Sequence, residues 1–257
     1  MREPCPLDSI LEPGGLSVLF QPIFEVQEPG LRLHALECLS RGPKGTQLEP
    51  ADALFQYVRS INAEARVDRE CVAHALREAG QLRGVPTFSF NVHASTLDKD
   101  PDFPAFVGET AERHQIANSR LIVEIVEYSP SSSGRALIDA LDTFRCMGMR
   151  IAVDDIGAGF SYFRKILDCR PDYFKLDRYF VNQAHEDDYR QALLEAVSGL
   201  ARKCGARVVA EGVENFDELN IVKVSGIDLV QGYLFCPPLP ATLLQSGFVR
   251  TNAGCLS

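Results

Sequence analysis

Residues 16–39 read LSVLFQPIFEVQEPGLRLHALECL and contain two apolar runs, at 16–24 and 31–39. Both runs have the length and the β-favouring residues of strands. The linker EVQEPG (25–30) is too short to carry the crossover helix that parallel neighbours need. This stretch therefore predicts an antiparallel hairpin at the start of the fold.

Six further short apolar runs follow the hairpin, and helix-like segments separate most of them. The runs are TFSFNV (87–92), LIVEIV (121–126), RIAVDD (150–155), DYFKLD (172–177), RVVAEG (207–212) and DLVQGY (228–233). The main helical segments cover residues 51–79, 133–148 and 187–205. Strands that alternate with helices pair in parallel, so we predict an α/β fold, a (β/α)8 TIM-like barrel with an antiparallel first strand. We expect a single domain over residues 1–257, with its core at about 16–240 and short terminal arms.

The composition limits the partners that the chain can bind. Its 26 lysines and arginines stand against 35 aspartates and glutamates, a formal net charge of -9. There is no overall positive field for duplex nucleic acid, so an anionic substrate must be bound by local cations. No run is long and apolar enough to suggest membrane insertion, and the N-terminus is unlike a signal peptide. Eight cysteines without a C-x-x-C pair suggest reduced thiols, and we expect a cytoplasmic protein.

Polar side chains stand at or near the carboxyl ends of almost all the predicted strands. They are Glu37, Asn91, Glu124, Asp154 with Asp155, Lys175, Glu211 and Gln231. In a barrel these ends open onto one mouth, where loops build active sites. So many acids around one lysine must be protonated or bind cations. Their oxygen atoms suit Mg²⁺ or Mn²⁺ better than zinc or Ca²⁺, and the Asp-Asp pair suits two ions.

Eight short motifs follow one another along the chain. They are FQPIF (20–24), ALECLSR (35–41), FNVHAS (90–95), VEIVE (123–127), VDDIGAGFS (153–161), FKLDR (174–178), VVAEGVEN (208–215) and VQGYLF (230–235). Together they resemble the EAL family of cyclic di-GMP phosphodiesterase domains over about residues 16–240. The resemblance implies a (β/α)8 barrel with an antiparallel first strand, in agreement with the predicted hairpin.

The resemblance also implies a two-metal site that cleaves cyclic di-GMP to linear 5′-pGpG. One Mg²⁺ or Mn²⁺ ion would be held by Glu37, Asn91, Glu124 and Asp154, and a second by Asp154, Asp155 and Glu211. A water or hydroxide between the ions would attack the phosphorus. Lys175 would orient that water, act as its base, or neutralise Asp155, and these roles are compatible.

Further family positions would contact the substrate around the mouth. They are Gln21, Leu39, Arg41, Glu214 and Gln231. Arg41 would clamp a phosphate, and Gln21 would contact a guanine edge unless it bonds within the hairpin. Gln231 and Glu214 could equally support the metal ligands or a loop. Glu127 would anchor the loop at 156–161, or it is an ordinary acid at a helix N-terminus.

The signature Glu-Ala-Leu of the family is Glu37-Cys38-Leu39 here, and strand alternation turns Cys38 away from Glu37. The loop from Ile156 also departs from the family pattern, and the helix after it serves the family's dimer contact. We expect a homodimer, with a regulatory protein as a further candidate partner.

Two alternative functions stay open: a catalytically silent cyclic di-GMP receptor, and an unrelated Mg²⁺-dependent barrel enzyme that forms enolates. Silent relatives usually lose metal ligands, whereas every matched position here keeps its oxygen donor.

Overall fold

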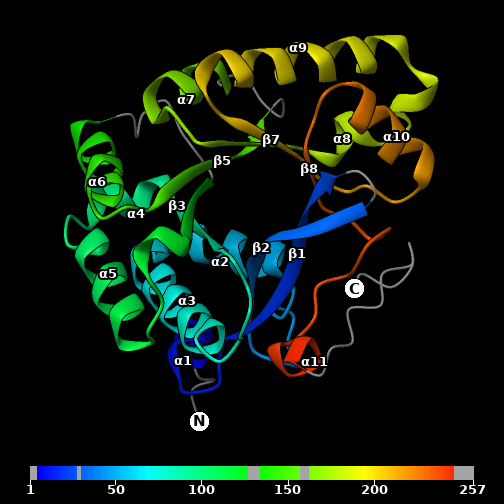
Figure 1. Cartoon of the computed structure of the whole chain (residues 1–257). Helices are drawn as coiled ribbons and strands as arrows, with labels where there is room; N and C mark the ends of the chain where they lie inside the picture. Colours follow the sequence, from blue (N-terminus) through cyan, green and yellow to red (C-terminus); the bar gives the residue numbers. More distant parts are fainter. Residues whose placement is uncertain (1–4, 28–29, 127–133, 157–161, 246–257) are drawn as a thin grey trace.

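The computed structural model describes residues 5–27, 30–126, 134–156 and 162–245, without the side chains of Asp155 and Tyr162. Within these residues the strands form a closed barrel in the order β1 to β8 (Figure 1). The strands are β1 (Ser17–Gln27), β2 (Gly30–Arg41), β3 (Phe88–His93), β4 (Leu121–Val126), β5 (Arg150–Ile156), β6 (Tyr173–Leu176), β7 (Arg207–Ala210) and β8 (Leu229–Val230). Strand β1 pairs antiparallel with both β2 and β8, and all other neighbours pair in parallel. The predicted barrel with an antiparallel first strand is confirmed.

Helices surround the barrel (Figure 1). They are α1 (Pro6–Leu11), α2 (Ala51–Ser60), α3 (Glu64–Ala79), α4 (Ala94–Lys99), α5 (Phe103–Arg113), α6 (Arg135–Cys146), α7 (Tyr162–Cys169), α8 (Arg178–Val181), α9 (Asp188–Cys204), α10 (Phe216–Val224) and α11 (Ala241–Gln245), with short 3-10 turns η1 (Asn118–Arg120) and η3 (Ala184–Glu186). The segment predicted as helical at 51–79 is two helices, because the chain turns at Asn62, which has a φ of 54°. Helix α9 ends as expected at Gly205, whose φ is 73°.

The barrel interior has two layers, because side chains on a strand point alternately inward and outward. The lower layer is apolar and consists of Ile23, Ala35, Ile122, Ala152, Tyr173, Val209 and Leu229. On β2, β4, β5 and β6, and directly after β7 and β8, a polar residue follows the residue of the apolar layer by two positions. These polar residues are Glu37, Glu124, Asp154, Lys175, Glu211 and Gln231. Strand β1 runs the opposite way, so Gln21 precedes Ile23 by two residues. The polar residues predicted at strand ends thus form one layer at the barrel mouth.

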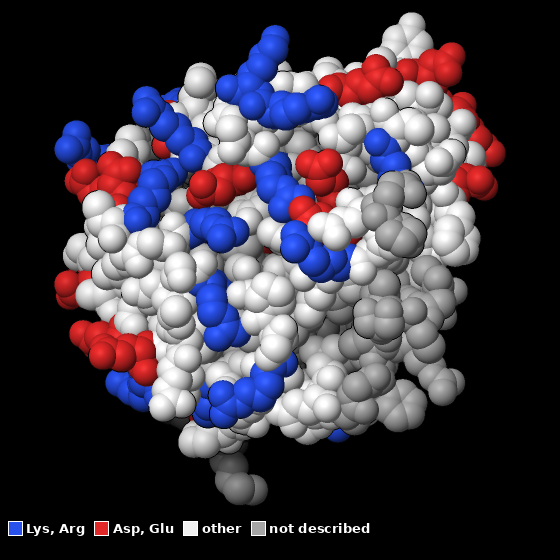
Figure 2. All heavy atoms as spheres, in the orientation of Figure 1, with Lys and Arg blue, Asp and Glu red and all other residues white. Residues whose placement is uncertain are grey.

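Outward-facing side chains of the same strands pack beneath the helices. Phe90, Val123, Val153 and Phe174 are buried in the core that also contains Leu141 of α6. None of the helices in the described ranges is long and apolar enough to cross a membrane. On the face seen in Figure 2, acidic and basic side chains are interspersed rather than gathered into one basic surface.

Candidate active site

Lys175 lies at the centre of the polar layer and contacts four carboxylates. Its Nζ atom is 2.7 Å from Glu124 Oε2, 2.7 Å from Glu211 Oε1, 3.0 Å from Glu37 Oε1 and 3.5 Å from Asp154 Oδ1. Lys175, Glu37 and Glu124 are buried, whereas the side chains of Asp154 and Glu211 are 17% and 21% exposed. The four acids come from β2, β4, β5 and the end of β7, so closure of the barrel brings them together.

Amide side chains surround Glu37. Gln231 Nε2 donates to Glu37 Oε2 at 2.6 Å and to Gln21 Oε1 at 3.1 Å. Asn91 Nδ2 donates to Glu37 Oε1 at 3.4 Å. Gln21 Nε2 donates to the Cys236 carbonyl at 3.1 Å, so this amide bonds across the end of β8 and not within the hairpin. These contacts fix the orientation of the Glu37 carboxylate and place Asn91 beside it.

Burial and neighbouring charges change the pKa values of this cluster. Burial raises the pKa of Glu124 to about 8, because the attraction of Lys175 is offset by repulsion from Glu37 and Asp154. Burial likewise raises the pKa of Glu211 well above its ordinary value. Burial would also raise the pKa of Glu37, but Lys175, Gln231 and Asn91 outweigh it and the pKa is lowered. Four carboxylates raise the pKa of Lys175 despite its burial. The cluster therefore has more acid than its one ammonium can neutralise.

The donor atoms of this cluster fit a hard divalent cation. Asn91 Oδ1 and Asp154 Oδ1 are buried and accept no hydrogen bond, although Asp154 Oδ1 lies 3.5 Å from Lys175 Nζ. A buried oxygen without a hydrogen bond is costly unless a positive group contacts it. Within the described part of the chain, no three or more His, Cys, Asp or Glu side chains are placed to hold a metal ion together. The Lys175 ammonium lies among the carboxylates instead, and the side chain of Asp155 is outside the described atoms.

A pocket of about 440 Å³ opens beside the cluster, between α2 and the ends of β2 to β5. Two predicted metal ligands, Asn91 and Asp154, line this pocket, and so do two predicted substrate-binding residues, Leu39 and Arg41. The guanidinium of Arg41 also donates to the Ser40 carbonyl at 2.9 Å. The sequence interpretation missed Phe55, Gln56 and Arg59, which line the same pocket from α2. Their spacing of one helical turn was the signal that could have revealed them.

The structure does not bring every predicted residue to the cluster. Glu214 has a side chain that is 47% exposed and pairs with Arg178 at 3.1 Å, and its backbone N–H donates to Glu218 at 2.8 Å. These contacts agree with the loop-supporting alternative. Glu127 and residues 157–161 lie outside the described residues. Lys165, which sequence reasoning missed, donates from Nζ to the Asp154 carbonyl at 2.7 Å.

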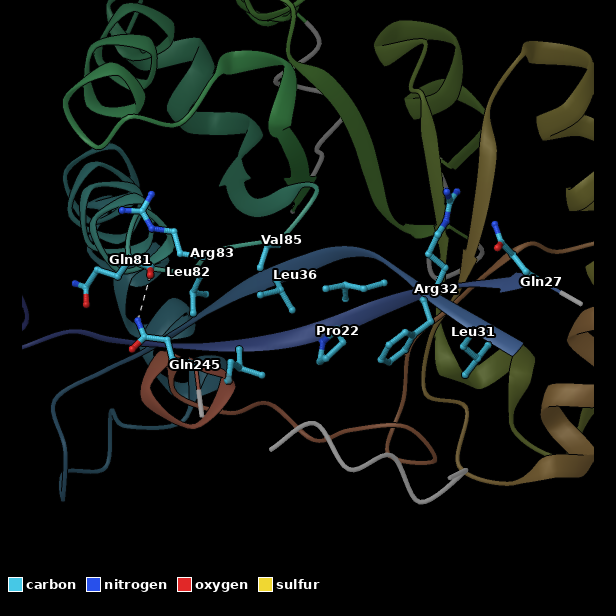
Figure 3. A pocket seen from close by; sticks show the side chains of 14 residues that line it. Pro22, Gln27, Leu31, Arg32, Leu36, Gln81, Leu82, Arg83, Val85 and Gln245 are labelled. Atoms are coloured by element: carbon cyan, nitrogen blue, oxygen red, sulfur yellow. Dashed lines mark hydrogen bonds between the residues drawn. The ribbon is translucent and has the colours of Figure 1, made fainter. Parts of the chain in front are cut away.

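A second and larger cavity, of about 890 Å³, lies on the outer wall of the barrel. Figure 3 shows Pro22, Leu36 and Val85 pointing into it, near the end of α11. Gln245 closes one side of this cavity by donating to the Gln81 carbonyl at 3.3 Å. None of the predicted site residues lines this cavity, so the oxygen donors and the smaller pocket define the candidate active site.

Comparison with known proteins gives the family of this fold and site. The family model described as EAL domain matches residues 7–238. The chain belongs to the EAL domain family. The alternative of an unrelated enolate-forming barrel enzyme is therefore excluded.

This EAL domain is similar to the oxygen sensor protein DosP of Escherichia coli. The two are 28% identical over 233 residues, which cover 88% of this chain and 28% of DosP. The probable cyclic di-GMP phosphodiesterase PdeG of Escherichia coli is 27% identical over 231 residues, which cover 88% of this chain and 45% of PdeG.

Solved structures resemble this EAL domain as well. Klebsiella pneumoniae BlrP1, in a manganese and cyclic di-GMP complex, is 28% identical with a TM-score of 0.78, covering 90% of this chain and 57% of that one. The EAL domain of Xanthomonas citri FimX, in complex with cyclic di-GMP, has a TM-score of 0.79 at 20% identity, covering 91% of this chain and 92% of that one. The FimX similarity shows the fold alone. The chain spans less than half the length of the curated relatives DosP and PdeG.

Proposed function

We propose that this EAL domain is a metal-dependent phosphodiesterase that hydrolyses cyclic di-GMP to linear 5′-pGpG. The observation that carries the proposal is the convergence of four carboxylates on one point at the barrel mouth. The unbonded Oδ1 atom of Asn91 adds an amide oxygen beside them. The name of PdeG and the ligands of BlrP1 support the same assignment.

The acids and the amide would hold two divalent cations, Mg²⁺ or Mn²⁺. One ion would be bound by Glu37, Asn91, Glu124 and Asp154, and the other by Asp154, Asp155 and Glu211. When bound, such a pair of ions would acidify a water molecule and neutralise charge on the phosphate under attack. The excess of acid over ammonium in the described cluster favours binding of further positive charge.

Lys175 would orient the attacking water from within this layer. Burial alone would lower its pKa, but the surrounding carboxylates raise it, so the side chain stays an ammonium at neutral pH. An ammonium has three donors and no acceptor. We therefore assign Lys175 as a hydrogen-bond donor that positions the water.

The substrate would lie across the mouth above this layer. Arg41, which lines the smaller pocket, would bind a phosphate with its planar guanidinium, and Leu39 would contact the substrate beside it. Gln21 would reach a guanine edge from β1. Gln231 would act on the reaction through Glu37, whose carboxylate it holds at 2.6 Å, and Glu214 would hold the loop after β7.

We also propose a homodimer that forms through α7 and works in the cytoplasm. Phe163 and Leu167 lie one turn apart on this helix and are 59% and 73% exposed. Large apolar side chains exposed side by side are typical of interaction surfaces. A regulatory protein partner is a further candidate for the same helix.

A silent receptor that binds cyclic di-GMP without cleaving it is the second candidate. The observation that favours it is the lack of a complete metal site among the described side chains. In that case Lys175 would be the permanent partner of the carboxylates. The pocket beside Arg41 would then serve binding alone.

Turnover separates the two candidates. The protein is incubated with cyclic di-GMP and Mn²⁺, with and without chelator, and 5′-pGpG is followed by chromatography. We expect hydrolysis that chelator and Asp154→Ala abolish and that Asp139→Ala leaves intact, since Asp139 is an exposed acid on α6. Tight binding without turnover would establish the receptor, and hydrolysis that survives both chelator and Asp154→Ala would refute the metal mechanism.

A further inference from the structure

Helix α2 presents a stripe of side chains to the pocket beside the carboxylate cluster. Ala51, Phe55 and Arg59 follow one another at intervals of four residues, and Asp52 and Gln56 repeat the same interval. Residues four apart lie on one face of a helix, so these side chains face the pocket together. We call this set, Ala51, Asp52, Phe55, Gln56 and Arg59, the α2 stripe.

The packing of α2 holds this stripe in place. On its opposite side, Leu54 and Val58 are fully buried in a cluster with Ile10 and Val67. This burial fixes the rotation of the helix about its axis. The α2 stripe is therefore a preformed wall of the pocket, in which Phe55 and Arg59 are half-buried and Asp52 and Gln56 are exposed.

Phe55 is supported from inside the pocket. Its ring centroid lies 5.2 Å from that of His93, with the planes inclined at 57°. His93 is in turn fixed by Asp68, which accepts from the His93 backbone at 3.0 Å and contacts Nδ1 at 2.9 Å. An aromatic ring braced in this way offers a rigid apolar surface for a flat ligand.

Two arginines of the pocket suit the phosphate group of a ligand, while Asp52 and Asp154 in the same lining balance their charge. Arg41 at the end of β2 and Arg59 on α2 bring two guanidinium groups to the pocket. Guanidinium groups bind phosphate oxygens in a planar, bidentate geometry.

The size and place of the pocket indicate which part of a ligand it receives. Its volume of about 440 Å³ lies near the lower end of the range for small-molecule sites, roughly 300–1,000 Å³. Asn91 and Asp154, two of the proposed metal ligands, form its inner edge. A ligand that reacts at the metals would therefore extend its unreacted part over Arg59 and Phe55.

We propose that the α2 stripe binds the guanylate unit of cyclic di-GMP that is not being cleaved. Arg59 contacts the second phosphate, the base lies against Phe55, and Gln56 and Asp52 offer an amide and a carboxylate to the base edge. This inference rests on the proposed function, because it takes cyclic di-GMP as the substrate. It assigns Arg59 and Phe55 as residues that determine affinity and specificity for the second half of the dinucleotide.

The test compares two substrates that share only the phosphodiester. Cyclic di-GMP has the second guanylate unit, and bis(p-nitrophenyl) phosphate lacks it. We expect Arg59→Ala to raise KM for cyclic di-GMP about tenfold, with kcat changed much less. Its effect on kcat/KM for the smaller ester should be several times weaker. Arg59→Lys should recover part of the loss, and Arg66→Ala, which removes an exposed arginine of α3 outside the pocket, is the matched control.

An unchanged KM in Arg59→Ala would overturn the inference while leaving the phosphodiesterase standing. An equal loss on both substrates would also overturn it, because the change would then act on the reaction centre. If the wild type shows no turnover, the proposed function fails, and calorimetric binding of cyclic di-GMP with Ca²⁺ decides the inference instead. A Kd about tenfold weaker in Arg59→Ala would support it; equal affinity, or no binding by the wild type, would refute it.

Discussion

The Nζ atom of Lys175 on β6 lies 2.7 Å from Oε2 of Glu124 on β4, although β5 separates these strands in the sheet. The contact therefore crosses the barrel interior. Both side chains are buried, so water screens the pair little. Lys175 also contacts Glu37 on β2, four strands away around the barrel, and so occupies the point on which the proposed metal ligands converge.

Lys175→Met should destabilise the domain, because it leaves buried carboxylates without their ammonium. Removing one partner of a buried ion pair costs about 3–5 kcal/mol. The pKa values of Glu124 and Glu211 are raised in the folded state. As the pH falls, these two acids therefore bind protons at a higher pH in the folded protein than in the unfolded chain. The loss should therefore be largest at pH 9 and smaller at pH 5, where these acids are neutral.

Urea unfolding of wild type and Lys175→Met at both pH values measures this effect. Lys203→Met, which removes an exposed lysine at the end of α9, is the control and should change little. A loss from Lys175→Met that is the same at pH 5 and pH 9 would show that the carboxylates do not depend on this ammonium.

His34 should make the domain less stable in mild acid. Burial lowers the pKa of His34 to about 4, and Arg207 adds to the effect. The unfolded chain then binds a proton between about pH 6.5 and pH 4 that the folded protein does not, so stability falls as the pH falls through this window. The structure explains the preference for the neutral ring: Arg150 donates to the Tyr173 hydroxyl at 2.6 Å, and that hydroxyl can donate to His34 Nε2 at 3.1 Å.

The variant His34→Gln keeps an acceptor but cannot titrate. Its free energy of unfolding should fall less than that of the wild type between pH 6.5 and pH 4, by at most about 3 kcal/mol. Denaturant unfolding across this range gives the comparison. Parallel pH profiles for the two proteins would mean that His34 is not the acid-sensitive group.

Two glycines should respond in opposite ways to alanine. A Cβ atom at Gly232, next to Gln231, would lie 2.1 Å from the Val213 carbonyl oxygen and 2.4 Å from its nitrogen. The backbone must shift to admit it, which typically costs about 1–3 kcal/mol. A Cβ at Gly199 in α9 meets nothing within 4 Å, so alanine there should stabilise the helix by roughly 0.5–1 kcal/mol. Thermal and urea unfolding of both variants checks the pair, and a change of the same sign at both positions would be unexpected on this packing.

Cys38 in the signature motif should be chemically silent. Its side chain is buried, and burial raises the pKa of the thiol well above its ordinary value. Native protein treated with iodoacetamide should be alkylated at the exposed Cys146 and Cys204 but not at Cys38. Peptide mass spectrometry reads out each site, and Cys38→Ala should retain hydrolysis. Rapid alkylation of Cys38 in the folded protein would reveal an opening of β2 that this packing does not allow.

The fold and the polar layer could be predicted because both follow from local spacing. The short linker at 25–30 required a hairpin, and the two-residue period of strands placed Glu124 and Lys175 on the same side of the wall. The turn at Asn62 was missed within the helical segment 51–79, although asparagine tolerates the left-handed conformation found there. The helical pattern on either side hid the break.

Contacts made by barrel closure could not be predicted from spacing. Gln231 bonds to Gln21, which lies 210 positions earlier, and only the closed register of β1 with β8 brings them together. The contacts of Lys175 with Glu37, Glu124, Asp154 and Glu211 likewise depend on barrel closure, and the side chain of Asp155, its predicted partner, lies outside the described atoms. Arg59 was missed, although it stands one helical turn after Phe55, because a single arginine on a helix surface is usually solvated.

Binding of Mn²⁺ at the mouth decides whether these oxygen donors form a metal site. Free Mn²⁺ is followed by electron paramagnetic resonance while the ion is titrated into wild type and Asp154→Ala at pH 8. We predict two bound ions in the wild type and the loss of at least one in the variant, together with the loss of 5′-pGpG formation. Equal Mn²⁺ binding by both proteins, or no binding by either, would contradict the metal-dependent mechanism.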